Sequence, residues 1–111
     1  MLIELRMDNS IHGGEDLSDQ TKSVVEEALH RFQDRINRVD VHLSTTNNHK
    51  SGEGDKRCMI EVRMDRREPI VVTREAANLG PAIRDTIHAL KKSIEHSLGR
   101  ESTLAQLRDH R

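Results

Sequence analysis

Four short stretches of the chain alternate hydrophobic and polar residues, and this pattern restricts the fold more than any other feature. In the first stretch, Ile3, Leu5 and Met7 alternate with Glu4 and Arg6, as in a strand with one buried face. Successive side chains of a strand point to opposite faces, so each stretch has one apolar face that must be covered. We expect strands at residues 2–8, 39–44, 57–65 and 69–73.

Two further stretches repeat hydrophobic residues every three or four positions, which is typical of amphipathic helices. The first covers about residues 18–36 and begins at Ser18, whose hydroxyl can cap a helix. The second covers residues 82–98, with a start near Asn78 and with Pro81 suited to its first turn. The hydrophobic stripe of the first helix consists of Leu17, Thr21, Val24, Val25, Ala28, Leu29, Phe32 and Ile36.

These six elements follow one another in the order β-α-β-β-β-α, which places the chain in the α+β class. A four-stranded sheet with both helices packed on one face would bury the apolar side of every element. The helix between the first two strands predicts a parallel pair, and the later strands predict antiparallel hairpins. The expected core residues are Ile3, Leu5, Val25, Leu29, Phe32, Val41, Ile60, Val62, Ile83, Ile87, Leu90 and Ile94.

The chain is expected to form a single domain over residues 1–98. Because Gly commonly follows the last turn of a helix, Gly99 predicts the end of the second helix, and residues 99–111 are predicted to form a flexible C-terminal tail. Residues 45–56 hold no apolar side chain and two glycines, so little burial offsets the entropy of ordering them. We therefore predict a mobile hairpin loop at these positions.

Composition argues against several classes of protein. The single Phe and the absence of Tyr and Trp leave no aromatic platform on which bases could stack. With 18 Lys and Arg against 19 Asp and Glu, nucleic-acid binding would require the cations to gather on one surface. Cys58 is the only cysteine, which rules out a disulfide within the chain and favours a reducing compartment. No signal peptide or membrane-spanning stretch is visible, and we expect a cytoplasmic protein without membrane association.

Residue types that carry out catalysis are scattered along the chain. Cys58 alternates with predicted core residues, which favours a buried apolar role over that of a nucleophile. His42, His49 and Cys58 could surround the hairpin, but their spacing matches no compact metal-binding motif. The glycine-containing segments lack the spacing of phosphate-binding loops, and the carboxylates form no isolated acid–base pair. The sequence therefore predicts no catalytic residue, metal site, cofactor or small-molecule substrate.

The last predicted helix differs in charge from the rest of the chain. Asp85 and Glu95 are the only acids between residues 82 and 98, and several basic side chains lie opposite the hydrophobic stripe. Lys and Arg that contact phosphates release condensed counterions, so about four or five contacts support binding at modest salt. An ordinary solvated helix surface has the same composition, and charge alone does not decide between the two. The basic residues are Arg84, His88, Lys91, Lys92 and His96.

Two segments carry a resemblance to a known family. The first is RFQDRINRVDVHL, residues 31–43, which has the pattern aromatic-x-Asp-Arg-Ile-Asn-x-Val-x-Val. The second is NLGPAIRDTIHALKKSIEHSL, residues 78–98, in which Ala-Ile precedes spaced leucines and basic residues. Together with the chain length and the order of elements, they resemble the ribosome hibernation-promoting factor and protein Y family over roughly residues 1–98.

The resemblance implies a stress or stationary-phase factor that binds the small ribosomal subunit and promotes hibernation or inhibits translation. The family's fold resembles a double-stranded-RNA-binding domain with an added first strand, and basic residues on its two helices contact ribosomal RNA. A chain of this length would correspond to a short form without the additional C-terminal domain of long members. The expected RNA-binding residues are Lys22, Arg31, Arg35, Arg84, His88, Lys91, Lys92 and His96.

The chain also departs from the family pattern. Glu26 and Glu27 stand in the middle of the first helix, where the family usually carries lysines, and Ala89 stands where a lysine is common. Residues 78–80, Asn-Leu-Gly, replace a usual Asp-x-Tyr. We therefore expect a diverged relative. The alternative is a protein–protein regulatory module that docks a partner through a sheet edge or through the tail, and the oligomeric state stays open.

Overall fold

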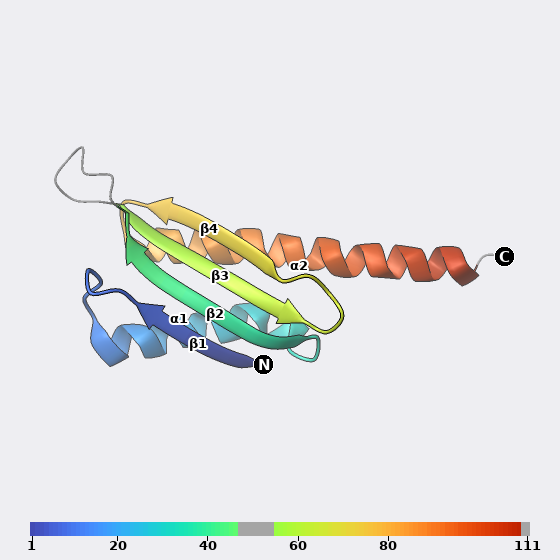
Figure 1. Ribbon diagram of the computed structural model, residues 1–111, viewed down its shortest axis with the longest axis horizontal. Helices are drawn as coiled ribbons and strands as arrows, with labels where there is room; N and C mark the ends of the chain where they lie inside the picture. Colours follow the sequence, from blue (N-terminus) through green and yellow to red (C-terminus); the bar gives the residue numbers. More distant parts are fainter. Residues whose placement is uncertain (47–54, 110–111) are drawn as a thin grey trace.

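The computed structural model describes residues 1–46 and 55–109, with side chains described as far as Gly99. The elements follow the order β-α-β-β-β-α, which confirms the predicted α+β fold (Figure 1). A short 3-10 turn is added directly after the first helix. The elements are β1 (Leu2–Met7), α1 (Gly14–Leu29), η1 (His30–Phe32), β2 (Ile36–Thr45), β3 (Lys56–Met64), β4 (Ile70–Ala76) and α2 (Leu79–Asp109).

The four strands form one sheet in the order β1-β2-β3-β4. β1 pairs in parallel with β2, and the other two pairings are antiparallel, as the sequence predicted. The register joins Leu5 to Val41, Val41 to Ile60 and Ile60 to Val72, so one row of aliphatic side chains crosses all four strands. Because side chains alternate between faces along each strand, all four strands turn their apolar sides to the same face of the sheet.

Both helices cover this apolar face, and the opposite face of the sheet stays open (Figure 1). α2 packs on β3 and β4, whereas α1 packs on β1 and against α2. Leu29 of α1 and Leu90 of α2 are fully buried in one core cluster with the aliphatic residues of the strands. The predicted core residues are all buried except Ile3 and Leu5, which stay partly exposed because β1 lies at the edge of the sheet.

The first helix begins earlier than the sequence predicted, at Gly14 rather than at Ser18. Gly13 and Gly14 have φ angles of 141° and 53°, which residues with a Cβ rarely adopt, and this pair turns the chain into the helix. The carbonyl of Gly13 accepts a hydrogen bond from Leu17 N at 3.2 Å, so Gly13 is the N-cap. Ser18 therefore lies inside the helix, and its predicted capping role is wrong.

The first helix also ends earlier than predicted. α1 stops at Leu29, and η1 continues far enough to bury Phe32. Ile36, which completes the helical spacing in the sequence, is instead the first residue of β2 and is buried there. Val24, another member of the predicted stripe, is 47% exposed. Phe32 and Ile36 are four residues apart by coincidence, so hydrophobic spacing alone could not locate this boundary.

α2 begins where the sequence predicted, next to Asn78 and with Pro81 in its first turn. The predicted stop at Gly99 is wrong, because the helix continues to Asp109 (Figure 1). A Gly in a helix interior costs about 1 kcal/mol relative to Ala. The residues that follow include Glu, Leu, Ala, Gln and Arg, which favour helix and offset that cost. The flexibility expected of residues 99–111 stays a prediction.

The hairpin between β2 and β3 is shorter than predicted, since Thr45 and Lys56 belong to the strands. Thr46 N donates a hydrogen bond to Asp55 O at 2.8 Å and extends the pairing by one step. The mobility predicted for this loop concerns residues that lie outside the described part of the chain. The β3–β4 connection forms the predicted turn, which begins at Asp65.

Candidate functional site

The outward side of α2 carries the basic residues that the sequence singled out. The opposite side of the helix, from Ile83 to Ile94, is buried against the sheet. With 3.6 residues per turn, residues four apart form a row along one side of a helix. Of the five basic residues, only Lys91 is half-buried, and the others are exposed. We name this row the α2 ridge, and it consists of Arg84, His88, Lys91, Lys92 and His96.

The side chains of the α2 ridge make no ion pair with any other residue that the structure describes. Two arginines on the open face of the sheet, Arg38 and Arg63, differ in this respect. Arg38 Nε donates to Asp40 at 2.9 Å, and Arg63 Nε donates to Glu61 at 2.9 Å. The hydrogen bond from Arg38 lowers the pKa of the Asp40 carboxyl, so this pair stays ionised at neutral pH. Carboxylates of the sheet therefore neutralise Arg38 and Arg63, while the α2 ridge leaves its cations available to an anionic partner.

A shallow groove between α1 and α2 places Lys91 near Arg31, another residue predicted to bind RNA. The groove has a volume of about 560 Å³, and Glu27 of α1 also lines it. Arg31 forms an ion pair with Glu95 of α2, and its guanidinium lies 4.5 Å from the centroid of the Phe32 ring. The structure thus gathers Arg31 and Lys91 on one surface, but the two glutamates reduce the positive charge there.

Lys22 and Arg35, also predicted to bind RNA, lie off the α2 ridge. Lys22 is half-buried on α1, two residues before Val24, which lines the groove. Two residues correspond to about 200° around a helix, so Lys22 lies on the side of α1 away from α2. Arg35 is exposed in the turn between η1 and β2 and belongs to neither helix. The predicted set is therefore only partly brought together by the fold.

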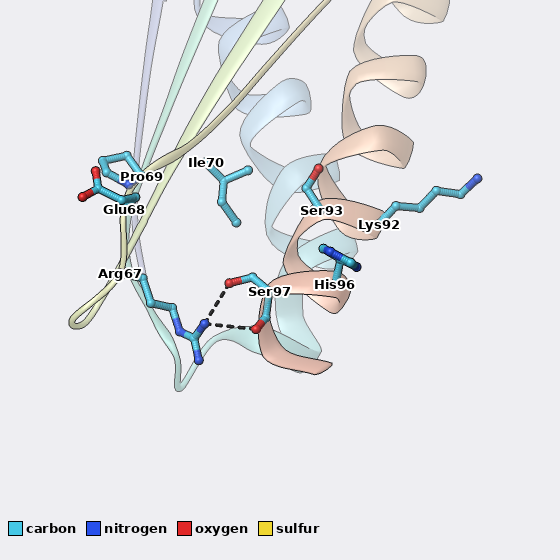
Figure 2. A pocket seen from close by; sticks show the side chains of 8 residues that line it. All are labelled: Arg67, Glu68, Pro69, Ile70, Lys92, Ser93, His96 and Ser97. Atoms are coloured by element: carbon cyan, nitrogen blue, oxygen red, sulfur yellow. Dashed lines mark hydrogen bonds between the residues drawn. The ribbon is translucent and has the colours of Figure 1, made fainter. Parts of the chain in front are cut away.

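One basic residue that the sequence did not single out lies next to the α2 ridge. Arg67, in the β3–β4 turn, lines a cleft together with Lys92 and His96 (Figure 2). In the sequence it is one of two adjacent arginines in the segment DRRE, and neither charge nor spacing tells which of them meets a helix. The conformation of the turn determines which arginine faces α2, because Arg66 adopts a left-handed conformation with a φ angle of 59°.

Cys58 and His42 occupy opposite faces of the sheet. Cys58 is buried opposite Leu43, whereas His42 pairs with Met59 on the open face, so the two cannot share a metal ion. His49, the third ligand considered, lies outside the described residues. Burial raises the pKa of the Cys58 thiol to about 11, so this thiol is protonated at neutral pH, which agrees with its predicted apolar role. Within the described part of the chain, no three His, Cys, Asp or Glu residues could hold a metal ion, and no helix could cross a membrane.

Residues 10–102 match the family described as Sigma 54 modulation protein / S30EA ribosomal protein. The chain belongs to this family. The match includes all of α1, α2 as far as residue 102, and the whole α2 ridge. It confirms the resemblance to the hibernation-promoting factor and protein Y family that the two sequence segments indicated.

Two solved structures share the fold of this S30EA-family chain. A ribosomal subunit interface protein from Coxiella burnetii has a TM-score of 0.68 and 14% identity, over 89% of this chain and 99% of that one. The protein Y N-terminal domain from Thermus thermophilus has a TM-score of 0.68 and 20% identity, over 86% of this chain and 98% of that one. At these identities the likeness establishes the fold alone. No curated protein matches the chain.

Proposed function

We propose that this S30EA-family protein is a ribosome-associated factor that binds ribosomal RNA of the small subunit through the α2 ridge. Membership of the family supports ribosome association, and so do the names of the structural relatives, a ribosomal subunit interface protein and a protein Y domain. Bound in this way, the protein would inhibit translation or keep idle ribosomes in hibernation under stress. This is a cytoplasmic binding function that needs no catalytic residue or cofactor.

The observation that carries the proposal is the unpaired charge of the α2 ridge. Arg84, Lys91 and Lys92 have no carboxylate partner among the described residues, whereas Arg38 and Arg63 on the sheet have theirs. A paired arginine must give up one partner to gain another. An unpaired exposed cation instead exchanges condensed counterions for phosphates, which favours binding through the entropy of counterion release.

The acids of α1 restrict where RNA can lie on the protein. Glu26 is exposed on α1, and Glu27 lines the groove between the helices. Carboxylates at these positions repel phosphates that approach from the α1 side. We therefore propose that the RNA follows the outward side of α2 and does not fill the groove, and that binding depends strongly on salt concentration.

Co-sedimentation of the protein with small ribosomal subunits at two salt concentrations tests the proposal. With about four phosphate contacts, the affinity should fall roughly 100-fold between 50 and 200 mM salt, so the protein should pellet only at the lower concentration. The protein centrifuged without ribosomes controls for aggregation. Failure to pellet at either concentration would contradict the proposal and favour a protein–protein regulatory module. Equal pelleting at both would mean that the contact is not electrostatic.

A further inference from the structure

A cleft separates the β3–β4 turn from the middle of α2, beside the α2 ridge. Its volume is about 590 Å³. Arg67 lines it from the turn, and Lys92, Ser93 and His96 line it from α2 (Figure 2). Lys92 also belongs to the α2 ridge, so the cleft and the ridge form one continuous surface.

Arg67 is held in a defined position at this cleft. It is half-buried, and its Nη1 donates to the carbonyl oxygen of Ser97 at 3.1 Å and to Ser97 Oγ at 2.8 Å (Figure 2). The left-handed conformation of Arg66, which few residues other than Gly, Asn and Asp adopt, directs the next side chain toward α2. An arginine fixed in this way loses less conformational entropy when it binds a ligand.

Donors of several kinds meet at the cleft. Arg67 supplies a planar guanidinium, a group that binds phosphate oxygens well, whereas Lys92 lines the cleft but points its ammonium away from Arg67 (Figure 2). Ser93 and Ser97 are four residues apart, so their hydroxyls lie on the same side of α2 as the cleft. His96 adds a ring that carries either one or two N–H donors. This set of donors suits a tetrahedral anion with several oxygens.

The turn side of the cleft supplies an apolar wall. Pro69 and Ile70 line it, on the strand side of Arg67 (Figure 2). The carboxylate of Glu68 points away from α2. A nucleotide combines a charged phosphate with a ribose and a base that have apolar faces, and this combination matches the two parts of the cleft.

We propose that the cleft binds one phosphate group of a ribonucleotide, with Arg67 as its main charged partner. The phosphate can belong to an RNA strand that runs along the α2 ridge or to a free nucleotide. The RNA form rests on the proposed function, because Lys92 would join the contacts of the ridge to that of the cleft. The free-nucleotide form is independent of ribosome binding.

An NMR titration of the full ¹⁵N-labelled chain distinguishes the two sources of phosphate. The chain is titrated separately with inorganic phosphate, with adenosine monophosphate and with a single-stranded RNA oligonucleotide. Shifts at Arg67, His96 and Ser97 with the mononucleotide as well as the RNA support a site for free nucleotides. Shifts there with the RNA alone support a strand phosphate. No shift at these residues with any of the three ligands would overturn the proposal.

Charge-neutral variants separate the cleft from the ridge. Arg67→Gln removes the charge at similar side-chain length, and it should reduce the salt slope of RNA binding by about 1. Arg6→Gln, on the open face of the sheet, is the matched control and should leave the slope unchanged. An unchanged ¹⁵N spectrum away from the β3–β4 turn verifies that the Arg67→Gln protein is folded.

Lys91→Gln tests the α2 ridge without altering the cleft, because Lys91 lines the groove between α1 and α2 on the other side of the helix. If Lys91→Gln reduces the slope but Arg67→Gln does not, the cleft proposal is overturned while the proposed function stands. If the wild-type protein binds no RNA but mononucleotide shifts the signals of the cleft, the proposed function falls and the free-nucleotide site stands. The two proposals therefore fail separately.

Discussion

The two helices lie next to each other on the same face of the sheet, yet acids predominate on the outward side of α1 and basic residues on that of α2. Inward, each contributes fully buried aliphatic side chains, including Leu29 of α1 and Leu90 of α2. Outward, α1 presents Glu26 and Glu27, whereas α2 presents the α2 ridge. Packing on the sheet fixes only the inward side of each helix, so the outward side is where two helices with the same structural role can differ in function.

This difference explains how a chain with a formal net charge of −1 can present a cationic surface. Some of the acids lie on α1, and others pair with arginines on the open face of the sheet, as Glu61 does with Arg63. Arg84, Lys91 and Lys92 of the α2 ridge have no carboxylate partner among the described residues. The charge of an individual surface therefore predicts an anionic partner better than the charge of the whole chain does.

The largest expected effect concerns the core that both helices share. Phe32, directly after α1, is 8% exposed, so Phe32→Ala should lower the free energy of unfolding by about 3–5 kcal/mol. Val24→Ala, at a residue of α1 that is 47% exposed, should cost under about 0.5 kcal/mol. Urea unfolding followed by circular dichroism measures both. Equal losses would contradict the division of this part of the chain into an inward and an outward side.

Glu27→Lys would bring the charge on the outward side of α1 closer to that of α2. The substitution removes a carboxylate that repels RNA phosphates near Lys91, and it adds a cation at the same position. The affinity for an RNA oligonucleotide should therefore rise about five- to tenfold at low salt. Glu4→Lys makes the same change of charge on the open face of the sheet and should leave the affinity nearly unchanged. Fluorescence anisotropy measures both affinities. An equal gain in the two variants would show that binding responds to total charge and not to a particular surface.

A buried hydroxyl at the contact between α2 and β3 gives a smaller effect on stability. Thr86 Oγ1 lies 2.7 Å from the carbonyl oxygen of Ala82 and 3.2 Å from that of Cys58, and Thr86 is fully buried. Thr86→Val keeps the shape and loses the one hydrogen bond that the hydroxyl can donate to these carbonyls, which should cost about 1 kcal/mol. Thr73→Val, at an exposed position of β4, is the control and should change stability by less than about 0.5 kcal/mol. An increase in stability for Thr86→Val would show that the hydroxyl does not help to hold α2.

The ion pair between the helices gives the smallest expected effect. Glu95→Gln removes an acid from α2 and releases Arg31, so RNA affinity should rise about two- to threefold. Because both side chains are largely exposed, the free energy of unfolding should change by less than about 1 kcal/mol. Glu75→Gln breaks a similar pair with Arg57 on the sheet and should not alter RNA affinity. A loss of RNA affinity in the Glu95→Gln protein would contradict this role.

The sequence predicted the sheet and the start of α2 well because their patterns are local. Alternation along each strand identified its buried face, and the order of the elements predicted the pairing of all four strands. The limits of α1 depended on features that hydrophobic spacing does not contain, namely the paired conformations of Gly13 and Gly14 and the 3-10 turn before Ile36. At Gly99, the preference of one residue for ending a helix was outweighed by the helix-forming residues after it.

The candidate site could be predicted only as far as it lies on one helix. The spacing along α2 identified the ridge, because neighbours along a helix follow directly from the sequence. The contribution of Arg67 depends on the packing of a turn against a distant helix, and the pairing of Arg31 with Glu95 depends on the packing of two helices. Lys22 was included in the predicted RNA-binding set, but it lies on the side of α1 that faces away from α2.

Charge reversal on the two sides of the molecule tests the central claim most directly. Lys91→Glu/Lys92→Glu reverses two charges of the α2 ridge, and Arg6→Glu/Arg63→Glu reverses two on the open face. Both proteins are compared with the wild type in co-sedimentation with small ribosomal subunits at low salt. The ridge variant should no longer pellet while its unfolding free energy changes by less than about 0.5 kcal/mol, and the open-face variant should pellet like the wild type. Pelleting of the ridge variant, or equal loss in both, would contradict the assignment of RNA binding to α2.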